Sequence, residues 1–310
     1  MSPAGDGKKG PVPSSTYDDQ WIKSAWGQLG DAHADSRRPR PRVARALALM
    51  KLRPSLRVLD IACGRGEVPA YVRASGGWAV GLDFSPSVLA IARELRDAPA
   101  ASGNGTMELV GGDAARLPFA NESFDRVSML DIVEHLTPEQ LDAMFSEVRR
   151  VLSPQGYAVI HTLPNRWVYE IGYPMFRWIL WGLPKNPRSE IERKVHINEQ
   201  DIAGLARSLS RARLGARIWL EQLMPAQARW GRGAGGFADQ RDKLYPALAG
   251  WAGRLLEVLS LTPFRLLLAN DIFSIAWSDA DAAQPTVEIP LRLTERLYLF
   301  LRRRPRAPGQ

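Results

Sequence analysis

The chain of 310 residues contains one cysteine, Cys63, and four histidines. A single cysteine cannot form an intramolecular disulfide, and it argues against a metal site built from thiolates. The sequence also lacks an uninterrupted apolar run of about 18 residues, which argues against a helix that spans a membrane. Its first ten residues have no apolar stretch of the kind found in secretory signals. These absences lead us to expect a cytoplasmic enzyme or binding protein.

Apolar residues make up 45% of the sequence and charged residues 24%, which excludes a mainly disordered, collagen-like or coiled-coil chain. Residues 1–165 carry 19 basic and 19 acidic residues, whereas residues 166–310 carry 22 and 14. The whole net charge of +8 therefore lies in the second half. A basic surface attracts nucleic acid or anionic lipid. Arginines that only keep the chain soluble explain the excess equally well.

Shifts in composition along the chain predict its domain organisation. Residues 1–15 are rich in Gly, Pro, Ser and Lys and read as a disordered arm, and a helix is expected at Tyr17–Trp26. We predict one main domain over residues 16–279. It is followed by a basic amphipathic tail at 280–310 and is interrupted by insertions at 166–197 and 222–269, whose apolar segments are Trp167–Leu183 and Leu244–Ala269.

Short apolar strands alternate with helical patterns through much of the chain. Helix starts are marked by Ser85-Pro86 and by a capping box at Thr137–Gln140. The alternation predicts an α/β fold with a parallel sheet covered on both faces, and such sheets bind ligands at the carboxyl ends of their strands. The expected strands are Arg57–Ala62, Trp78–Leu82, Thr106–Val110, Phe124–Leu130, Tyr157–Leu163, Ala216–Leu220 and Asp271–Trp277.

Polar residues stand at successive strand ends. Asp60 closes the first strand, and Gly64 and Gly66 then form a turn that opens a helix, whose free N–H groups suit an anionic group. Asp83 follows the second strand, where a carboxylate can accept hydrogen bonds from two ribose hydroxyls. Asp113 follows the third, where it can accept one from an adenine amino group. Any one of them could be a solvated carboxylate, but their joint occurrence predicts a nucleoside site.

Two other phosphate-binding motifs compete for this turn. A dinucleotide fingerprint needs a third small residue, and Pro69 stands at that position. A nicotinamide-dependent reductase is therefore a weaker alternative. A P-loop is excluded because no Gly-Lys-Ser/Thr follows.

The segments DIACGRG (Asp60–Gly66), GLDFS (Gly81–Ser85), GDAARLPF (Gly112–Phe119) and DIVEH (Asp131–His135) resemble class I S-adenosylmethionine-dependent methyltransferases. The similarity is closest to the subgroup that includes ubiquinone and menaquinone biosynthesis methyltransferases. It covers residues 40–165 well, and 195–221 and 270–278 loosely. The resemblance implies a Rossmann-like sheet of seven strands, mostly parallel with an antiparallel last strand.

The resemblance also implies roles for individual residues. Asp60, Gly64 and Gly66 would hold the methionine part of S-adenosylmethionine. Asp83 would bind the ribose and Phe84 would lie against the adenine. The remaining cofactor residues would be Asp113 at the adenine amino group, Ala114 beside it, and Leu130 along the slot. Leu130-Asp-Ile-Val replaces the Asn/Asp-Pro-Pro-aromatic motif of the amine-methylating branch, which counts against amine methylation.

Methyl transfer is an in-line displacement that depends mostly on positioning, and an oxygen acceptor also needs a base. We expect His135 or His196 to be that base. His135 follows the fourth strand, and the loop that holds His196 often faces the pocket in relatives. A structural role at a helix start is the alternative for His135. His33 is expected to be solvated, and His161 to be a core residue bonded to the backbone.

Asp131, Glu134 and His135 have the i, i+3, i+4 spacing of one helical face. Some quinone-type O-methyltransferases similar to this chain use such a trio to hold a metal ion. Asp stands here in place of the usual first Glu and has a shorter reach. We therefore expect helix capping and an ion pair rather than a metal.

The apolar insertions are expected to cap the cofactor and to form a pocket for a small lipophilic acceptor, methylated at oxygen or at carbon. The tail around Leu293–Arg304 fits an interfacial helix on an anionic membrane, with Leu293, Leu297, Phe300 and Leu301 on one face. The insertions and the tail could instead form an ordinary core or a homodimer interface. A non-catalytic cofactor-binding regulator and an RNA methyltransferase remain as alternatives. Nucleic acid fits less well, because the arginines alternate with leucines.

Overall fold

The computed structural model describes residues 10–26, 39–98, 104–177, 190–221, 258–278, 284–288 and 293–302, with the single residues 186, 188, 251 and 255. Residues 1–9 of the expected disordered arm, His33, and most of the second insertion lie outside this part. Ser14–Thr16 form a short 3₁₀ turn (η1), and the expected N-terminal helix is α1 (Asp19–Trp26).

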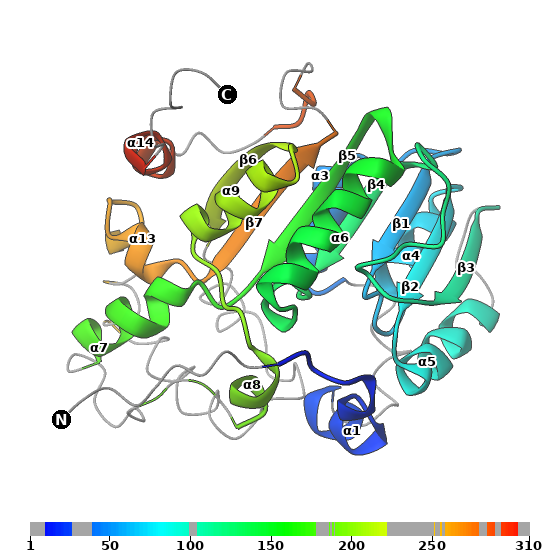
Figure 1. The fold of residues 1–310 in the computed structure, drawn as a ribbon, viewed down its shortest axis with the longest axis horizontal. Helices are drawn as coiled ribbons and strands as arrows, with labels where there is room; N and C mark the ends of the chain where they lie inside the picture. Colours follow the sequence, from blue (N-terminus) through cyan, green and yellow to red (C-terminus); the bar gives the residue numbers. More distant parts are fainter. Residues whose placement is uncertain are drawn as a thin grey trace.

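One sheet of seven strands organises the molecule, in the order β3-β2-β1-β4-β5-β7-β6 (Figure 1). β7 runs antiparallel to both of its neighbours, β5 and β6, and the other pairings are parallel. The Rossmann-like fold expected from the resemblance is therefore confirmed. The strands are β1 (Arg57–Ile61), β2 (Trp78–Asp83), β3 (Thr106–Gly111), β4 (Phe124–Leu130), β5 (Leu152–Thr162), β6 (Gly215–Glu221) and β7 (Asp271–Trp277).

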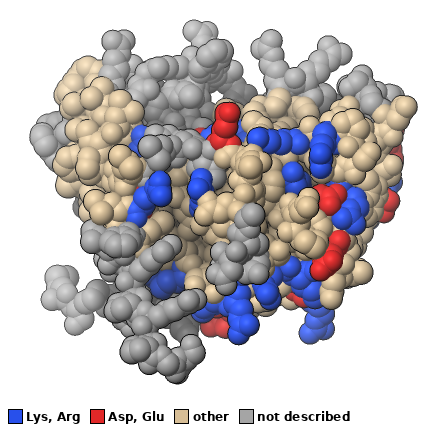
Figure 2. Space-filling view, turned by 90° about the horizontal axis from the view of Figure 1, so that it is seen from above, with Lys and Arg blue, Asp and Glu red and all other residues tan. Residues whose placement is uncertain are grey.

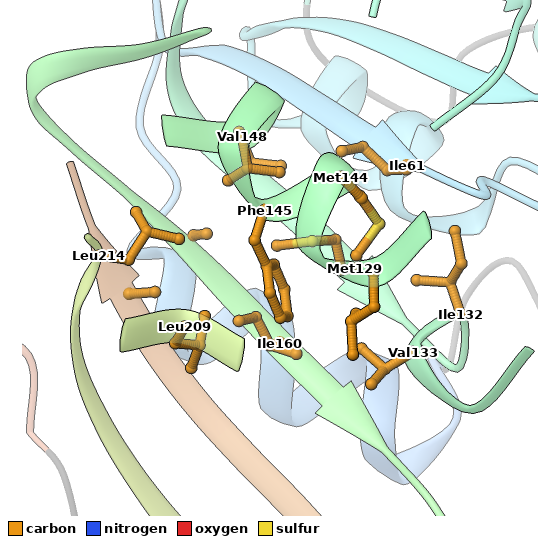
Figure 3. Packing of buried hydrophobic residues seen from close by; sticks show 14 of the residues in the cluster. Ile61, Met129, Ile132, Val133, Met144, Phe145, Val148, Ile160, Leu209 and Leu214 are labelled. Carbon is orange, nitrogen blue, oxygen red and sulfur yellow. The ribbon is translucent and has the colours of Figure 1, made fainter. Parts of the chain in front are cut away.

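Helices cover both faces of the sheet, because both faces of the central strands are apolar. On one face lie α6 (Pro138–Val151) and α9 (Ile202–Arg211), and on the other lie α3 (Pro41–Met50) and α4 (Glu67–Ala74) (Figure 1). Figure 3 shows the first interface, where Met144, Phe145 and Val148 of α6 meet strand side chains such as Met129 and Ile160. These residues are fully buried, and their close packing holds the central strands in place. The loops that follow the strands therefore start from a rigid base.

The predicted helix starts are confirmed by their caps. Ser85 accepts a hydrogen bond from the Val88 N–H at the start of α5 (Pro86–Asp97), and Pro86 occupies the first turn. At α6, Thr137 and Gln140 form the reciprocal capping box. These local signals place both helices directly after strand ends, and so they shape the loops that surround the site.

The described parts of the insertions and the tail lie near β5, β7 and β6, except α8, which lies below the central strands near α1 (Figure 1). They comprise η3 (Val168–Gly172, a π-helical turn), α7 (Tyr173–Phe176), α8 (Glu190–Val195), α13 (Arg265–Leu268) and α14 (Leu293–Arg302). Within the described residues, every helix is too short or too polar to cross a membrane.

Candidate active site

A pocket of about 260 Å³ opens at the carboxyl ends of the central strands. Its wall includes all but one of the predicted site residues: Asp60, Gly64, Asp83, Phe84, Asp113, Ala114, Leu130, His135 and His196. The sheet register explains this convergence, because Asp60 of β1 lies level with Gly81 of β2 and Ser128 of β4. The predicted strand-end residues therefore share one site.

Gly66 is the predicted residue that does not line the pocket. It is the N-cap of α4 with φ +80°, a backbone conformation that favours glycine. A Cβ there would lie 2.7 Å from Cε of Met107. Gly66 thus shapes the turn and allows α4 to pack closely, while Gly64, with φ +53°, presents its backbone to the pocket.

Two buried carboxylates organise the pocket floor. Asp60 Oδ1 accepts a hydrogen bond of 2.5 Å from the Ser128 hydroxyl, and burial raises the pKa of Asp60 to about 7. Asp83 accepts hydrogen bonds from the N–H groups of Gly64 (3.1 Å) and Ser85 (3.0 Å). Burial raises the pKa of Asp83 above its ordinary value despite these bonds. Burial therefore disfavours the negative charge of both groups, and a nearby cation would stabilise that charge.

The other cofactor candidates surround this floor. Asp113 caps its own turn by accepting a hydrogen bond from the Ala115 N–H, and Ala114 is buried beside it. Phe84 exposes 44% of its surface at the pocket wall, and Leu130 is half-buried at the end of β4. An apolar ring and a carboxylate thus stand on the wall beyond Asp83.

Tyr17 is a site residue that sequence reasoning missed. Its hydroxyl lies 3.1 Å from Nδ1 of His135, and its ring contacts Phe84 with centroids 5.5 Å apart. The Ser85 hydroxyl donates to its backbone carbonyl. Ile22 of α1 is buried against Val88 and Ile91, so the N-terminal segment is packed over the pocket. The apolar pattern of Tyr17–Trp26 predicted a helix, but nothing local linked that helix to the site.

His135 and His196 meet in the pocket, with ring centroids 5.0 Å apart. Burial, together with the neighbouring His196, lowers the pKa of His135 to about 3, so its imidazole is neutral at physiological pH. For His196 burial lowers the pKa, but Glu199, Glu134 and Glu192 outweigh it and leave a net increase. The two histidines therefore differ: the His135 imidazole is neutral and has little affinity for a proton, whereas His196 tends to retain one.

Asp131, Glu134 and His135 were predicted to share one helical face, and this prediction is wrong for Asp131. Asp131 has φ +60° and precedes a 3₁₀ turn, η2 (Val133–His135), instead of an α-helix. Its carboxylate points to Arg42 and His161, and His196 takes its place beside Glu134 and His135. Thr162 donates to Glu134, and Tyr17 contacts His135, so these side chains have partners without a metal ion.

His161 is fully buried, as expected, but it bonds to carboxylates and not to the backbone. Nδ1 lies 2.5 Å from Asp131 and Nε2 lies 3.0 Å from Asp271. Burial alone lowers the pKa of His161, yet the two carboxylates raise it to about 9. Arg42, 2.7 Å from Asp131, completes a buried charge network that reaches from the pocket wall to β7.

The apolar insertions do not cap the pocket in the described part of the chain. Glu192, Val195 and His196 line it from the first insertion, whereas no described residue of 166–177 or 251–269 does so. The expected pocket for an apolar acceptor is instead lined by Leu136, Leu163 and Val195, next to the histidines.

Comparisons with known proteins agree with this geometry. A family model described as a methyltransferase domain matches residues 58–156. A demethylmenaquinone methyltransferase from Mycobacterium sp. (strain KMS) is 32% identical over 213 residues, which span 64% of this chain and 80% of that relative. An uncharacterized methyltransferase from Synechocystis sp. is 35% identical over 122 residues, 39% of this chain and 54% of that protein.

Solved structures share the fold. An S-adenosylmethionine-dependent methyltransferase from Methanosarcina mazei aligns with a TM-score of 0.50 and 17% identity, over 78% of this chain and 99% of that one. Phosphoethanolamine N-methyltransferase 2 of Haemonchus contortus, in complex with S-adenosyl-L-methionine, aligns with a TM-score of 0.53 and 17% identity, over 87% of this chain and 61% of that one.

A sheet of this order, with a pocket lined by carboxylates and apolar side chains at the carboxyl ends of its central strands, together with the methyltransferase domain match, defines a class I S-adenosylmethionine-dependent methyltransferase. The chain belongs to this family, uses S-adenosylmethionine, and is related to the methyltransferases of quinone biosynthesis. The family resemblance drawn from the motifs is thereby confirmed.

The buried charge network predicts a specific pH dependence of stability. The raised pKa of His161 stabilises the folded state fully below its ordinary value of 6.5, and this stabilisation is lost as pH rises through about 9. Thermal unfolding should therefore show a falling Tm between these values.

Replacement of Asp131 by Asn should lower the free energy of unfolding by about 3 kcal/mol, because it leaves buried cations without their anion. The same replacement should also make Tm fall less steeply between pH 6.5 and about 9. Asp97→Asn, at an exposed ion pair with Arg96, is the matched control and should change neither. A Tm of Asp131→Asn equal to that of the unaltered protein would contradict the network's role.

Proposed function

We propose that the enzyme transfers a methyl group from S-adenosylmethionine to a small lipophilic acceptor of the quinone type, at oxygen or carbon, after deprotonation of an acceptor hydroxyl. The main support for this proposal is that one pocket contains buried carboxylates, a neutral histidine and apolar side chains. The name of the mycobacterial relative, a demethylmenaquinone methyltransferase, supports the acceptor class.

The cofactor fits the carboxylate end of the pocket. Asp60 and Gly64 would hold its methionine part, with Gly66 shaping the turn. Asp83 would accept from the ribose hydroxyls, since each of its oxygens takes one N–H and keeps a free lone pair. Beyond it, Phe84, Asp113, Ala114 and Leu130 would surround the adenine and the slot that leads to the acceptor.

S-adenosylmethionine supplies an electrophilic methyl group on a sulfonium. The chain's own task is to hold the acceptor in line and to exclude water, and for this the apolar side chains of Leu136, Leu163 and Val195 are suited. Little covalent work falls to the protein.

His135 is the proposed base, with Tyr17 as its partner. Its Nδ1 takes the Tyr17 proton as the Tyr17 oxygen takes the proton of the acceptor hydroxyl. The low pKa of His135 makes this transfer uphill, and methylation, which consumes the oxyanion, draws it forward. The same step serves both outcomes: the acceptor oxyanion is itself the nucleophile, or it donates electrons to the ring carbon that is methylated. Burial raises the pKa of Tyr17 well above its ordinary value, so its phenol stays protonated between turnovers. His196 contacts the acceptor.

Asp83→Ala is expected to weaken S-adenosylmethionine binding by about 10- to 100-fold, because hydrogen bonds to a charged group are lost. Isothermal titration measures this, and circular dichroism verifies that the fold survives. Asp97→Ala, which removes an exposed carboxylate outside the pocket, should bind as the unaltered protein does. If Asp83→Ala binds S-adenosylmethionine with unchanged affinity, Asp83 does not bind the ribose.

His135→Gln is expected to reduce kcat by about 10²- to 10⁴-fold, with cofactor affinity retained. Tyr17→Phe should reduce kcat too, whereas His196→Gln should mainly raise KM for the acceptor. Turnover to S-adenosylhomocysteine with a demethylated quinol is the measurement. Because the pKa of His135 is lowered to about 3, its protonation should not limit kcat down to pH 6. Full activity of His135→Gln would exclude it as the base.

A further inference from the structure

The described part of the two insertions exposes an unusual number of large apolar side chains. Trp251 and Leu261 are 71% and 76% exposed, and Leu255 and Val258 are exposed as well. Trp251, Leu255 and Val258 each have helical backbone. With Phe264, Ile171 and Met175, which are also exposed, they form what we call the insertion surface.

Contacts between the insertions join η3 and α7 to the segment around α13. The rings of Phe176 and Phe264 lie 6.2 Å apart between centroids. Gly172 of η3 lies directly against α13, where a Cβ would come within 1.8 Å of the Leu267 carbonyl oxygen. α7 and α13 accordingly lie side by side at one end of the molecule (Figure 1).

The described segments 171–176 and 258–268 of the insertion surface carry little charge. Their one charged side chain, Arg265, is 8% exposed, while Glu170 and Arg177 border the first segment and Arg254 and Glu257 stand between Trp251 and Val258 in the sequence. Elsewhere among the described residues, the large exposed apolar side chains are Phe84 in the pocket and Leu293 and Leu297 on α14. Monomeric soluble proteins rarely expose so large a contiguous apolar area unless it meets a partner or a membrane.

This surface is anchored at the same edge of the sheet as the pocket. Leu163, at the end of β5, lines the pocket, and Asn165 follows it two residues later. The Asn165 side chain donates to the carbonyls of Leu266 and Ala269 at α13. A lipophilic acceptor that leaves a membrane beneath the insertion surface would therefore reach the pocket at the edge where the base lies.

Charge favours a lipid bilayer over a second copy of the chain as the occupant. The net charge of +8 lies in the half that contains both insertions and α14. Arg296 is exposed beside Leu297 on α14, and Trp167 of the first insertion contacts Tyr298 of that helix. Figure 2 shows basic side chains in excess over acidic ones on the face seen from above. Like charges oppose self-association and attract anionic lipid.

We propose that the insertion surface docks the enzyme onto an anionic bilayer, so that the acceptor passes from the membrane into the pocket. The proposal rests on the lipophilic acceptor of the proposed function. The apolar side chains enter the interfacial region of the bilayer without crossing it, and the exposed Arg296 of α14 faces the headgroups.

The test is flotation of the full chain with vesicles of phosphatidylcholine and phosphatidylglycerol, and with phosphatidylcholine alone. The double variant Val258→Glu/Leu261→Glu should bind the mixed vesicles at least about tenfold more weakly, because two apolar side chains lose their burial. A control of equal charge change is Ala120→Glu/Gln155→Glu, at exposed positions near the opposite ends of the strands. A third variant, Leu293→Glu/Leu297→Glu, tests α14 separately.

The readouts separate this proposal from the proposed function. S-adenosylmethionine binding and turnover of a water-soluble acceptor should stay unchanged in Val258→Glu/Leu261→Glu, while turnover of a vesicle-held acceptor should fall. Docking by the insertion surface is overturned if the unaltered chain does not float with the vesicles. It is also overturned if the Ala120→Glu/Gln155→Glu control loses vesicle binding equally, or if only the α14 variant loses it. A dimer of the unaltered chain, seen by light scattering, that is lost in the Val258→Glu/Leu261→Glu variant would also overturn it. A failure to bind S-adenosylmethionine would instead overturn the proposed site and leave the flotation result standing.

Discussion

The parallel pairing of β1 with both β2 and β4 is the constraint on which the site depends. It sets Asp60 level with Gly81 and Ser128, and so it brings three strand ends that are distant in the sequence into one pocket. Asp83 then ties two loops together, since it accepts N–H groups from the turn after β1 and from the turn after β2. A slip of one residue in either pairing would turn these side chains to the opposite faces of the sheet.

The electrostatics of the pocket divide into two parts. Around Asp131, each buried carboxylate faces Arg42 or His161, and the attraction outweighs the cost of burial. Asp60 and Asp83 accept hydrogen bonds from neutral donors, and burial raises their pKa. The first part supports the fold. In the second part, burial disfavours the negative charge, and a sulfonium cation would stabilise it.

The sequence predicted the parts of the fold that local chemistry determines. Strand ends carried carboxylates, glycines marked the turn before α4, and the Ser85 and Thr137 caps marked helix starts; all lie where expected. Tyr17, which pairs with His135 across 118 residues, could not be predicted because no local pattern records that contact. The spacing of Asp131, Glu134 and His135 suggested one helical face, but the positive φ of Asp131 redirects its side chain to His161.

The insertions show why apolar composition alone does not locate a substrate pocket. Their sequence predicted a cover over the cofactor. In the described part of the insertions, side chains such as Ile171, Val258 and Leu261 instead face outward, and Asn165 holds α13 near the pocket's edge. Apolar side chains are favoured both where they pack inside a protein and where they contact lipid. The periodicity of the sequence therefore cannot distinguish these two surroundings. What distinguishes them is the direction of the side chains, which the packing of α13 against η3 determines. An acceptor that dissolves in membranes is scarce in water, and an enzyme that binds at the membrane surface meets it at a far higher local concentration. An outward apolar surface beside the pocket therefore serves a lipophilic acceptor better than the closed cover that the sequence suggested.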